Sequence, residues 1–142
     1  EALLFAAARA DHIEKTIRPA LARGAWVLSD RFLDSSRAYQ GQGALSDADI
    51  VTLHRIGSEG FLPDRTLFLT LPAGEAEARA RVRDGGASDR IGGRDQSFHR
   101  AVADAFARFA TDEAARFRAI DASGEPGAVT ARLIDALADL LP

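Results

Sequence analysis

Residues 26–43 read WVLSDRFLDSSRAYQGQG, and this stretch decides the fold. Trp26-Val27-Leu28 is a short apolar run that ends at the polar pair Ser29-Asp30, a pattern typical of a buried parallel strand. Phe32–Gln40 is expected to be helical and is followed by two glycines. A strand followed directly by a helix is half of a βαβ unit, which predicts a parallel sheet.

The same alternation of helix and short apolar strand continues on both sides of this stretch. No internal repeat or linker divides the chain, so we predict one α/β domain over residues 1–142, with helices covering both faces of a parallel sheet. Pro19 is expected to bend the first helix. The helices are predicted at Leu3–Leu21, Ser46 to about Gly60, Ala73–Arg83, Ser97–Ala115 and Pro126–Leu141, and the further strands at Thr66–Leu71 and Phe117–Ile120.

Composition excludes several classes of protein. The chain has no cysteine, which excludes disulfides and thiolate chemistry, and its three histidines have no metal-binding spacing. No apolar run approaches the roughly 20 residues that span a bilayer. A net charge of −3 argues against a general nucleic-acid binder. We therefore expect a cytoplasmic protein that needs neither a membrane nor nucleic acid.

Polar residues at the ends of the predicted strands are the first candidates for a site, because ligands of open α/β sheets bind there. Asp30 and Arg31 follow the first strand, and Arg31 can present a two-pronged donor to a phosphate while Asp30 orients it or a metal-bound water. Ala122 and Ser123 follow the last strand. The simpler interpretation of Asp30 is a helix cap, with Arg31 in solvent.

Two helix faces could contact a small molecule. Ser36, Tyr39 and Gln40 lie at helical spacing and offer a hydroxyl, a phenol and an amide to a base or sugar. Phe5 and Arg9 are four residues apart and could stack on and hydrogen-bond a base. An ordinary polar surface helix, and a core phenylalanine beside a solvated arginine, are the alternatives.

Arginines surround a glycine-rich segment at Asp84–Arg94, which we interpret as a loop that closes over phosphates as a lid. The alternative is a helix surface on which these arginines pair with Glu75, Glu77 or Asp84. The arginines concerned are Arg79, Arg81, Arg83, Arg90 and Arg94.

Assembled in order, these segments resemble bacterial thymidylate kinases along essentially the whole chain. D-R-F followed by S-x-x-A-Y-Q is fairly specific to that family, and its occurrence after LLFAAARA is more specific still. The other segments that carry the resemblance are LPDRTLFLTLP, DRI in the glycine-rich loop, SFHRAV and AIDAS.

The resemblance implies a P-loop kinase fold, with ATP and Mg²⁺ as co-substrate and cofactor, and a role for each candidate residue. Phe5 would stack on thymine, Arg9 would bond its exocyclic oxygen, and Arg31 would hold the dTMP phosphate, organised by Asp30. Ser36 and Gln40 would face the base edge and Tyr39 the deoxyribose. Arg90, with Arg79, Arg83 or Arg94, would reach the transferring phosphoryl group, and Ala122 and Ser123 would lie near adenine.

The chain departs from the family pattern in three places. Phe32 stands where the family more usually has tyrosine, and the lid reads DRIGG where DRIE is common. The family begins with a strand and a G-x-x-x-x-G-K-[ST] loop, which this sequence does not contain. We therefore expect roughly 60 further residues before Glu1 in an intact enzyme.

For the intact enzyme, the resemblance implies phosphorylation of dTMP to dTDP by a homodimer. The alternatives left open are another P-loop kinase of nucleosides or nucleotides, and a non-catalytic nucleotide-binding α/β domain. Activity measured across a panel of nucleotides distinguishes dTMP phosphorylation from the first alternative. A P-loop encoded in the upstream sequence would support the enzyme over the non-catalytic domain.

A prediction about the isolated 142-residue chain follows. It is expected to be inactive and to lack a cooperative unfolding transition, because removing the central P-loop strand would leave unpaired backbone and an open core. Thermal denaturation followed by circular dichroism checks this, and a sharp sigmoidal transition would contradict it.

Overall fold

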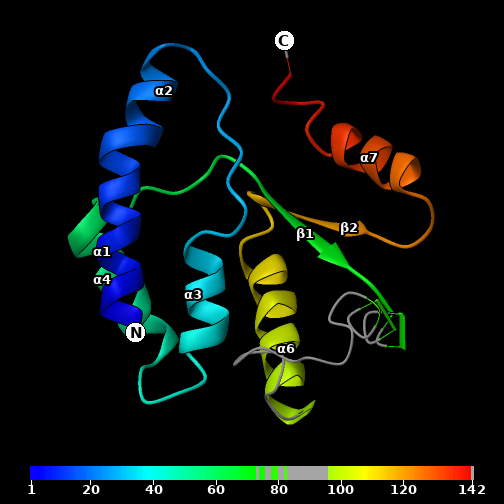
Figure 1. The fold of residues 1–142 in the computed structure, drawn as a ribbon, viewed down its shortest axis with the longest axis horizontal. Coiled ribbons are helices and arrows are strands. Elements are labelled where there is room, and N and C mark those ends of the chain that lie inside the picture. The colour runs from blue at the N-terminus through cyan, green and yellow to red at the C-terminus, as the bar shows by residue number, and fades with distance from the viewer. Residues whose placement is uncertain (73, 76–77, 80–81, 83–95, 142) are drawn as a thin grey trace. The chain divides into compact units, whose positions relative to one another are not determined.

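The computed structural model describes residues 1–72, 74–75, 78–79, 82 and 96–141 (Figure 1). The chain forms two compact units. The first comprises Glu1–Leu62 and Arg100–Phe106, and the second Pro63–His99 and Ala107–Pro142. The first unit carries four of the described helices and the second carries the sheet.

The first unit opens with a long helical segment that changes its pitch in the middle. It comprises α1 (Ala2–His12), a π-helical turn η1 (Ile13–Ile17) and α2 (Arg18–Ala22). Within η1, the Arg18 N–H donates to the Ile13 carbonyl, five residues back. Pro19 has no N–H and its ring crowds the preceding turn, so the wider turn accommodates it. The predicted helix is confirmed, and the expected disturbance at Pro19 takes the form of this π turn.

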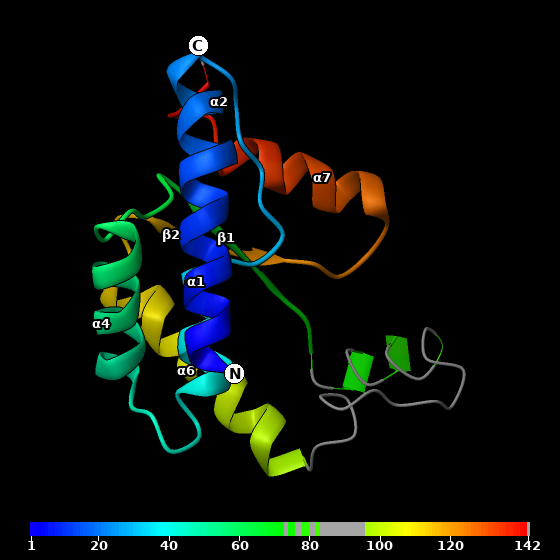
Figure 2. The same cartoon turned by 60° about the vertical axis from the view of Figure 1, so that its left-hand side comes forward.

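Helix α4 (Asp47–Ser58) packs against α1 (Figure 2). Gly57 lies at this contact, where an added Cβ would meet the Cβ of Ala10 at 3.6 Å, an ordinary van der Waals distance. Ile50 and His54, one turn apart on α4, are buried in this unit. The contact therefore places the inner face of α1 at a fixed distance from α4.

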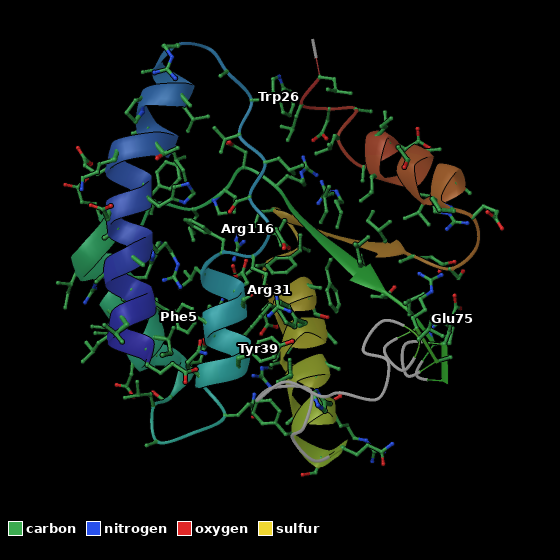
Figure 3. The ribbon with its side chains drawn as sticks, in the orientation of Figure 1. Phe5, Trp26, Arg31, Tyr39, Glu75 and Arg116 are labelled. Carbon is green, nitrogen blue, oxygen red and sulfur yellow. The ribbon has the colours of Figure 1, made fainter. Side chains whose placement is uncertain are left out.

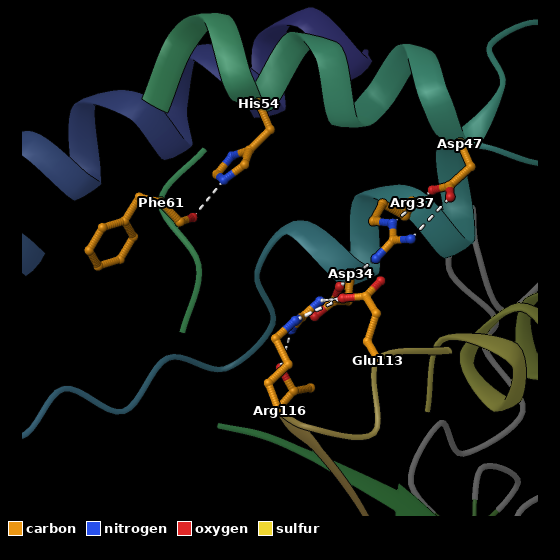
Figure 4. Close-up of polar contacts among 8 residues, drawn as sticks. Asp34, Arg37, Asp47, His54, Phe61, Glu113 and Arg116 are labelled. Atoms are coloured by element: carbon orange, nitrogen blue, oxygen red, sulfur yellow. Dashed lines mark hydrogen bonds and ion pairs between the residues drawn. The ribbon is translucent and has the colours of Figure 1, made fainter. Parts of the chain in front are cut away.

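Helix α3 (Leu33–Gln40) is tied to the start of α4 by a partly buried ion pair (Figure 4). Arg37 donates from Nε and Nη2 to the two carboxylate oxygens of Asp47, at 2.7 and 3.0 Å. Its Nη1 also donates to Oδ1 of Asp34 at 3.3 Å, and the Asp34 side chain is buried. A two-pronged pair of this kind fixes orientation as well as distance.

The second unit contains a parallel pair of strands, β1 (Thr66–Thr70) and β2 (Phe117–Asp121), which pair in register from Thr66↔Phe117 to Thr70↔Asp121. Helix α6 (Gln96–Asp112) precedes β2 in the chain, and α7 (Pro126–Asp135) packs on β2. Phe117 and Ile120 of β2 are buried. None of the described helices is long and apolar enough to cross a membrane. The parallel α/β class predicted from the sequence is confirmed.

The start of the sheet is held by Arg116, the residue before β2. Its Nη1 donates to Oγ1 of Thr66 at 2.7 Å, and its Nε donates to Glu113 at 2.9 Å (Figure 4). The Thr66 N–H in turn donates to the Arg116 carbonyl at 2.8 Å. These bonds set the register at the point where both strands begin.

The prediction of a strand at Trp26–Leu28 is wrong for this structure. These residues are irregular, and Leu28 is 94% exposed while Trp26 is also exposed (Figure 3). A strand exists only where a neighbour satisfies its N–H and C=O groups, and within the described residues this backbone has no ladder partner. The apolar run therefore remains extended without becoming part of the sheet.

The last helix is shorter than predicted. Helix α7 ends at Asp135, and residues 136–140 form turns with three-residue bonds such as Leu140 N–H to the Leu137 carbonyl. Asp139 in this segment accepts from Nη2 of Arg65 at 2.6 Å. Anchoring Asp139 to the residue before β1 favours this tighter path over continuation of the helix. Helix α6 likewise ends three residues before the predicted Ala115.

The capping box of α4 yields a stability prediction. The Ser46 Oγ accepts from the Asp49 N–H at 3.2 Å, and Asp49 accepts from the Ser46 N–H at 2.8 Å. Replacing Ser46 with alanine is expected to lower the free energy of unfolding of the full-length gene product by about 1 kcal/mol, because a helix donor loses its partner. Urea denaturation measures this. Thr52→Ala, in the middle of the same helix, is the control, and an equal loss there would contradict the cap.

Candidate functional site: predicted residues of α1, α3 and the loop before α3

A hydrogen bond between two predicted site residues joins α1 to α3. Nη2 of Arg9 donates to Oγ of Ser36, which is buried. Burial lowers the pKa of Arg9 from its ordinary value, and the negative charge of Asp34 partly offsets that effect. The interpretation of Arg9 as a solvated arginine is therefore wrong, because its guanidinium is partly desolvated and bonded across the helix pair.

Phe5 lies one turn before Arg9 on α1 and is 49% exposed. It is therefore no core phenylalanine, which was the alternative drawn from the sequence. Figure 3 shows its ring beside the helix, near the start of the chain. A half-exposed aromatic ring one turn from a fixed guanidinium offers a stacking surface next to a hydrogen-bond donor.

Arg31 adopts a backbone conformation that is uncommon for a residue with a side chain, with φ of 66°. Such a left-handed residue costs on the order of 1–2 kcal/mol, and residues of this kind cluster at functional sites as well as at turns and helix ends such as Glu59. Its guanidinium lies 5.1 Å from the centre of the Tyr39 ring, a cation–π distance (Figure 3). Arg31 and Tyr39 are thus brought together, with the Arg31 side chain exposed.

Gln40 closes the same face at the end of α3. Its Nε2 donates to Oε1 of Glu1 at 3.2 Å, which links the last turn of α3 to the first residue of the chain. The structure therefore places six of the predicted residues in the first unit, on α1, on α3 and on the loop between them: Phe5, Arg9, Arg31, Ser36, Tyr39 and Gln40.

Asp30 is the carboxylate that the sequence associates with a metal-bound water. The Asp30 carboxylate is exposed, and the described residues contain no cluster of three or more acidic, histidine or cysteine side chains that could hold a metal. Mg²⁺ is commonly bound by one or two carboxylates together with substrate phosphates and water. Asp30 fits that mode of binding, whereas a closed protein cage is not formed by the described part of the chain.

Ala122 and Ser123 belong to the second unit, directly after β2. The Ala122 N–H donates to the Thr70 carbonyl at 2.9 Å, and Ser123 N–H donates to Oδ1 of Asp121 at 2.9 Å. Hydrogen bonds from Ser123 lower the pKa of Asp121. Arg132 of α7 donates to the Asp121 and Ser123 carbonyls at 2.7 and 2.9 Å. The segment after the strand is therefore rigidly held.

Of the predicted lid arginines, only Arg79 falls within the described residues. Its Nη2 donates to Oε1 of Glu75 at 2.6 Å, one turn earlier, as in the surface-helix alternative. The other arginines and the predicted loop lie outside the described residues: Arg81, Arg83, Arg90, Arg94 and residues 84–94.

Sequence reasoning missed a second layer of residues behind Arg9. The ring of Phe32 lies 5.7 Å from the Arg9 guanidinium and meets the His54 ring edge-on, 5.8 Å between centres. His54 is only 2% exposed, and its Nε2 lies 2.6 Å from the Phe61 carbonyl. The sequence indicates that His54 lies on the same face of its helix as Ile50, four residues earlier. It does not indicate the ring contacts of His54, because Phe32 and Phe61 lie on other segments.

Comparison with known proteins identifies relatives over the whole chain. A family model described as thymidylate kinase matches residues 1–133. A thymidylate kinase of Rhizorhabdus wittichii is 59% identical over all of this chain and 69% of its own length. One of Bradyrhizobium diazoefficiens is 46% identical over all of this chain and 64% of its own length, and one of Rhodopseudomonas palustris is 44% identical over 94% and 59%. The chain thus spans about three fifths to two thirds of the length of these relatives.

Burial of His54 predicts a pH dependence of stability. Desolvation lowers the pKa of His54, and the Arg9 charge adds to this, while the hydrogen bond to Phe61 and the charge of Asp34 act in the opposite direction. A histidine with a depressed pKa in the folded state resists protonation that the unfolded chain accepts from about pH 6.5 downward. The free energy of unfolding is therefore expected to fall as the pH drops below that value.

The measurement is urea denaturation of the full-length gene product at pH 7.5 and 5.5. His54→Gln keeps a donor for the Phe61 carbonyl but cannot be protonated, so its loss between the two pH values is expected to be smaller than that of the wild type. His12→Gln, at an exposed position on α1, is the matched control. Equal losses in wild type and His54→Gln would show that His54 does not contribute.

Proposed function

This chain belongs to the thymidylate kinase family, and on that premise we propose that the full-length gene product transfers the γ-phosphoryl group of ATP to dTMP, forming dTDP and ADP. The observation that carries the proposal is the bond from Arg9 to Ser36, one turn from the half-exposed Phe5. This arrangement provides a flat stacking surface beside a fixed hydrogen-bond donor, the two features that recognition of a nucleobase requires.

The acceptor nucleotide occupies the face between α1 and α3. Phe5 stacks on the thymine ring, and Arg9 donates to its exocyclic oxygen, held in place by Ser36. Gln40 faces the base edge from the end of α3, and Tyr39 lies against the deoxyribose. The side chains in these roles are at least partly exposed, except for that of Ser36, which is buried and bonded to the partly exposed Arg9.

Arg31 holds the dTMP phosphate, with Asp30 beside it. The left-handed backbone at Arg31 places this residue in a sharp turn before α3, and an exposed guanidinium there can bind a phosphate with two parallel bonds. An oxygen of the dTMP phosphate then attacks the γ-phosphorus of ATP, and the bond between that phosphorus and the bridging oxygen of ADP breaks. The acceptor oxygen is already anionic, so no general base is indispensable, and positioning with charge stabilisation supplies the catalysis.

The donor side involves Ala122 and Ser123 near the adenine of ATP. Arg90 is proposed to act on the transferring phosphoryl group from a lid at residues 84–94, together with Arg79, Arg83 or Arg94. Arg79 must leave its exposed pair with Glu75 to do so, which costs little because such surface pairs contribute at most about 1 kcal/mol. Magnesium would supply charge neutralisation during transfer, and Asp30 would organise Arg31 and the water shell of the metal. We further propose that the protein is a cytoplasmic homodimer.

The activity is tested by ADP release from the full-length gene product with ATP and Mg²⁺, using dTMP, dUMP, dCMP, dGMP and AMP as acceptors. A preference for dTMP is expected, and its margin over dCMP follows from the Arg9 donor, because cytosine carries an amino group where thymine has the exocyclic oxygen O4. Preference for another nucleotide would retain the kinase chemistry and remove the base assignments. No turnover by the folded protein with any acceptor would contradict the proposed function.

Arg31→Ala tests the phosphate role. The variant is expected to lose about 10²–10³-fold in kcat/KM for dTMP, the range found when one donor to a developing charge is removed. Arg23→Ala is the control, because Arg23 is an exposed arginine at the end of α2. Turnover close to that of the wild type in Arg31→Ala would remove Arg31 from the site.

A further inference from the structure

Phe32 has no role in the chemistry described above, yet it lies at the point where the parts of the acceptor site meet. It directly follows Arg31 and is the N-terminal cap residue of α3. Its own ring lies 5.7 Å from the Arg9 guanidinium, within the range of a cation–π contact. One residue thus touches the base-reading arginine while being joined in the chain to the phosphate-binding one.

The Phe32 ring is itself held in place by contacts with two further aromatic rings. His54 meets it at 83° between planes with 5.8 Å between centres, and Phe61 meets it at 75° and 6.4 Å, both edge-on arrangements that aromatic pairs favour. Nε2 of His54 lies 2.6 Å from the Phe61 carbonyl, which ties the two supporting residues together (Figure 4). The ring therefore has little freedom to turn away from Arg9.

Arg9 needs such support because its guanidinium is partly desolvated. A long, flexible side chain with five donors can adopt many arrangements, and the described contacts restrict it from two directions. Ser36 accepts from Nη2, and Phe32 offers its aromatic ring. The two contacts act on different parts of the group, since Ser36 bonds one nitrogen and the Phe32 ring lies 5.7 Å from the guanidinium carbon.

We propose that Phe32 is a positioning residue for base recognition, which holds the Arg9 guanidinium in the plane required to donate to the exocyclic oxygen of the acceptor base. The inference rests on the proposed function, and it assigns a residue through which the enzyme selects its acceptor base. Phe32 itself touches neither the base nor the phosphate. Its effect is therefore expected on acceptor binding and selectivity, with little effect on the ATP side.

The first test compares Phe32→Leu with Phe32→Tyr in the full-length gene product. Leucine removes the ring, and KM for dTMP is expected to rise about tenfold, with kcat and KM for ATP within about twofold of wild type. The preference for dTMP over dCMP is expected to fall by a similar factor. Tyrosine keeps the ring, so both values are expected to stay close to those of the wild type. Phe109→Leu, at a buried phenylalanine of the second unit, is the matched control for general destabilisation and should leave the preference unchanged.

A double-mutant cycle with Arg9→Ala tests whether Phe32 affects dTMP binding through Arg9. If Phe32 acts through Arg9, adding Phe32→Leu to Arg9→Ala causes no further rise in the dissociation constant for dTMP, measured by calorimetry. Additive effects in the cycle, or an unchanged KM in Phe32→Leu, would overturn the inference while leaving the kinase activity standing. A wild-type protein that neither binds nor phosphorylates dTMP would overturn the proposed function and this inference together.

Discussion

The first unit depends on one constraint, the partly buried guanidinium of Arg9. A charge in this position is tolerated only when its donors are bonded and its plane is supported, because a desolvated cation without partners is costly. Ser36 supplies the acceptor from α3, Phe32 supplies the aromatic contact, and Asp34 supplies opposite charge. Meeting this requirement brings α1 against α3 and so creates the face on which an acceptor nucleotide can lie.

The supports around Arg9 are built on rigid elements. Helix α3 is held to the start of α4 by Arg37, which bonds the buried Asp34 on its own helix and the partly exposed Asp47 on α4. Helix α4 begins with a reciprocal cap and packs closely on α1 at Gly57. Helix ends fixed in this way limit small displacements, and displacements of about 1 Å at a binding site can cost a hundredfold in rate. The charged network and the close helix contact therefore contribute to function by restricting movement.

Much of the candidate site was predictable because its residues follow local rules. Arg9 lies one turn from Phe5, and Ser36, Tyr39 and Gln40 share a helix face, which are consequences of helical periodicity. Periodicity could not show that Arg9 bonds Ser36 or that Phe32 supports Arg9, because those partners are 23 to 27 residues apart and meet only through packing. The pair between Arg79 and Glu75, by contrast, is local, and the sequence analysis gave it as the alternative to a lid arginine.

Sequence by itself determined the described helices and the capping box at Ser46, because each rests on interactions within a few residues of the chain. It also indicated the apolar runs at Thr66 and Phe117, which become strands because they pair with each other. It also determined which polar residues are candidates for the site. Tertiary structure alone decided that Trp26–Leu28 is not a strand, since an apolar run becomes one only when a neighbour completes its hydrogen bonds. It also decided that His54 is buried behind Phe32 and that its pKa is lowered, because burial and long-range ring contacts, unlike helix propensity, exist only after the chain has folded.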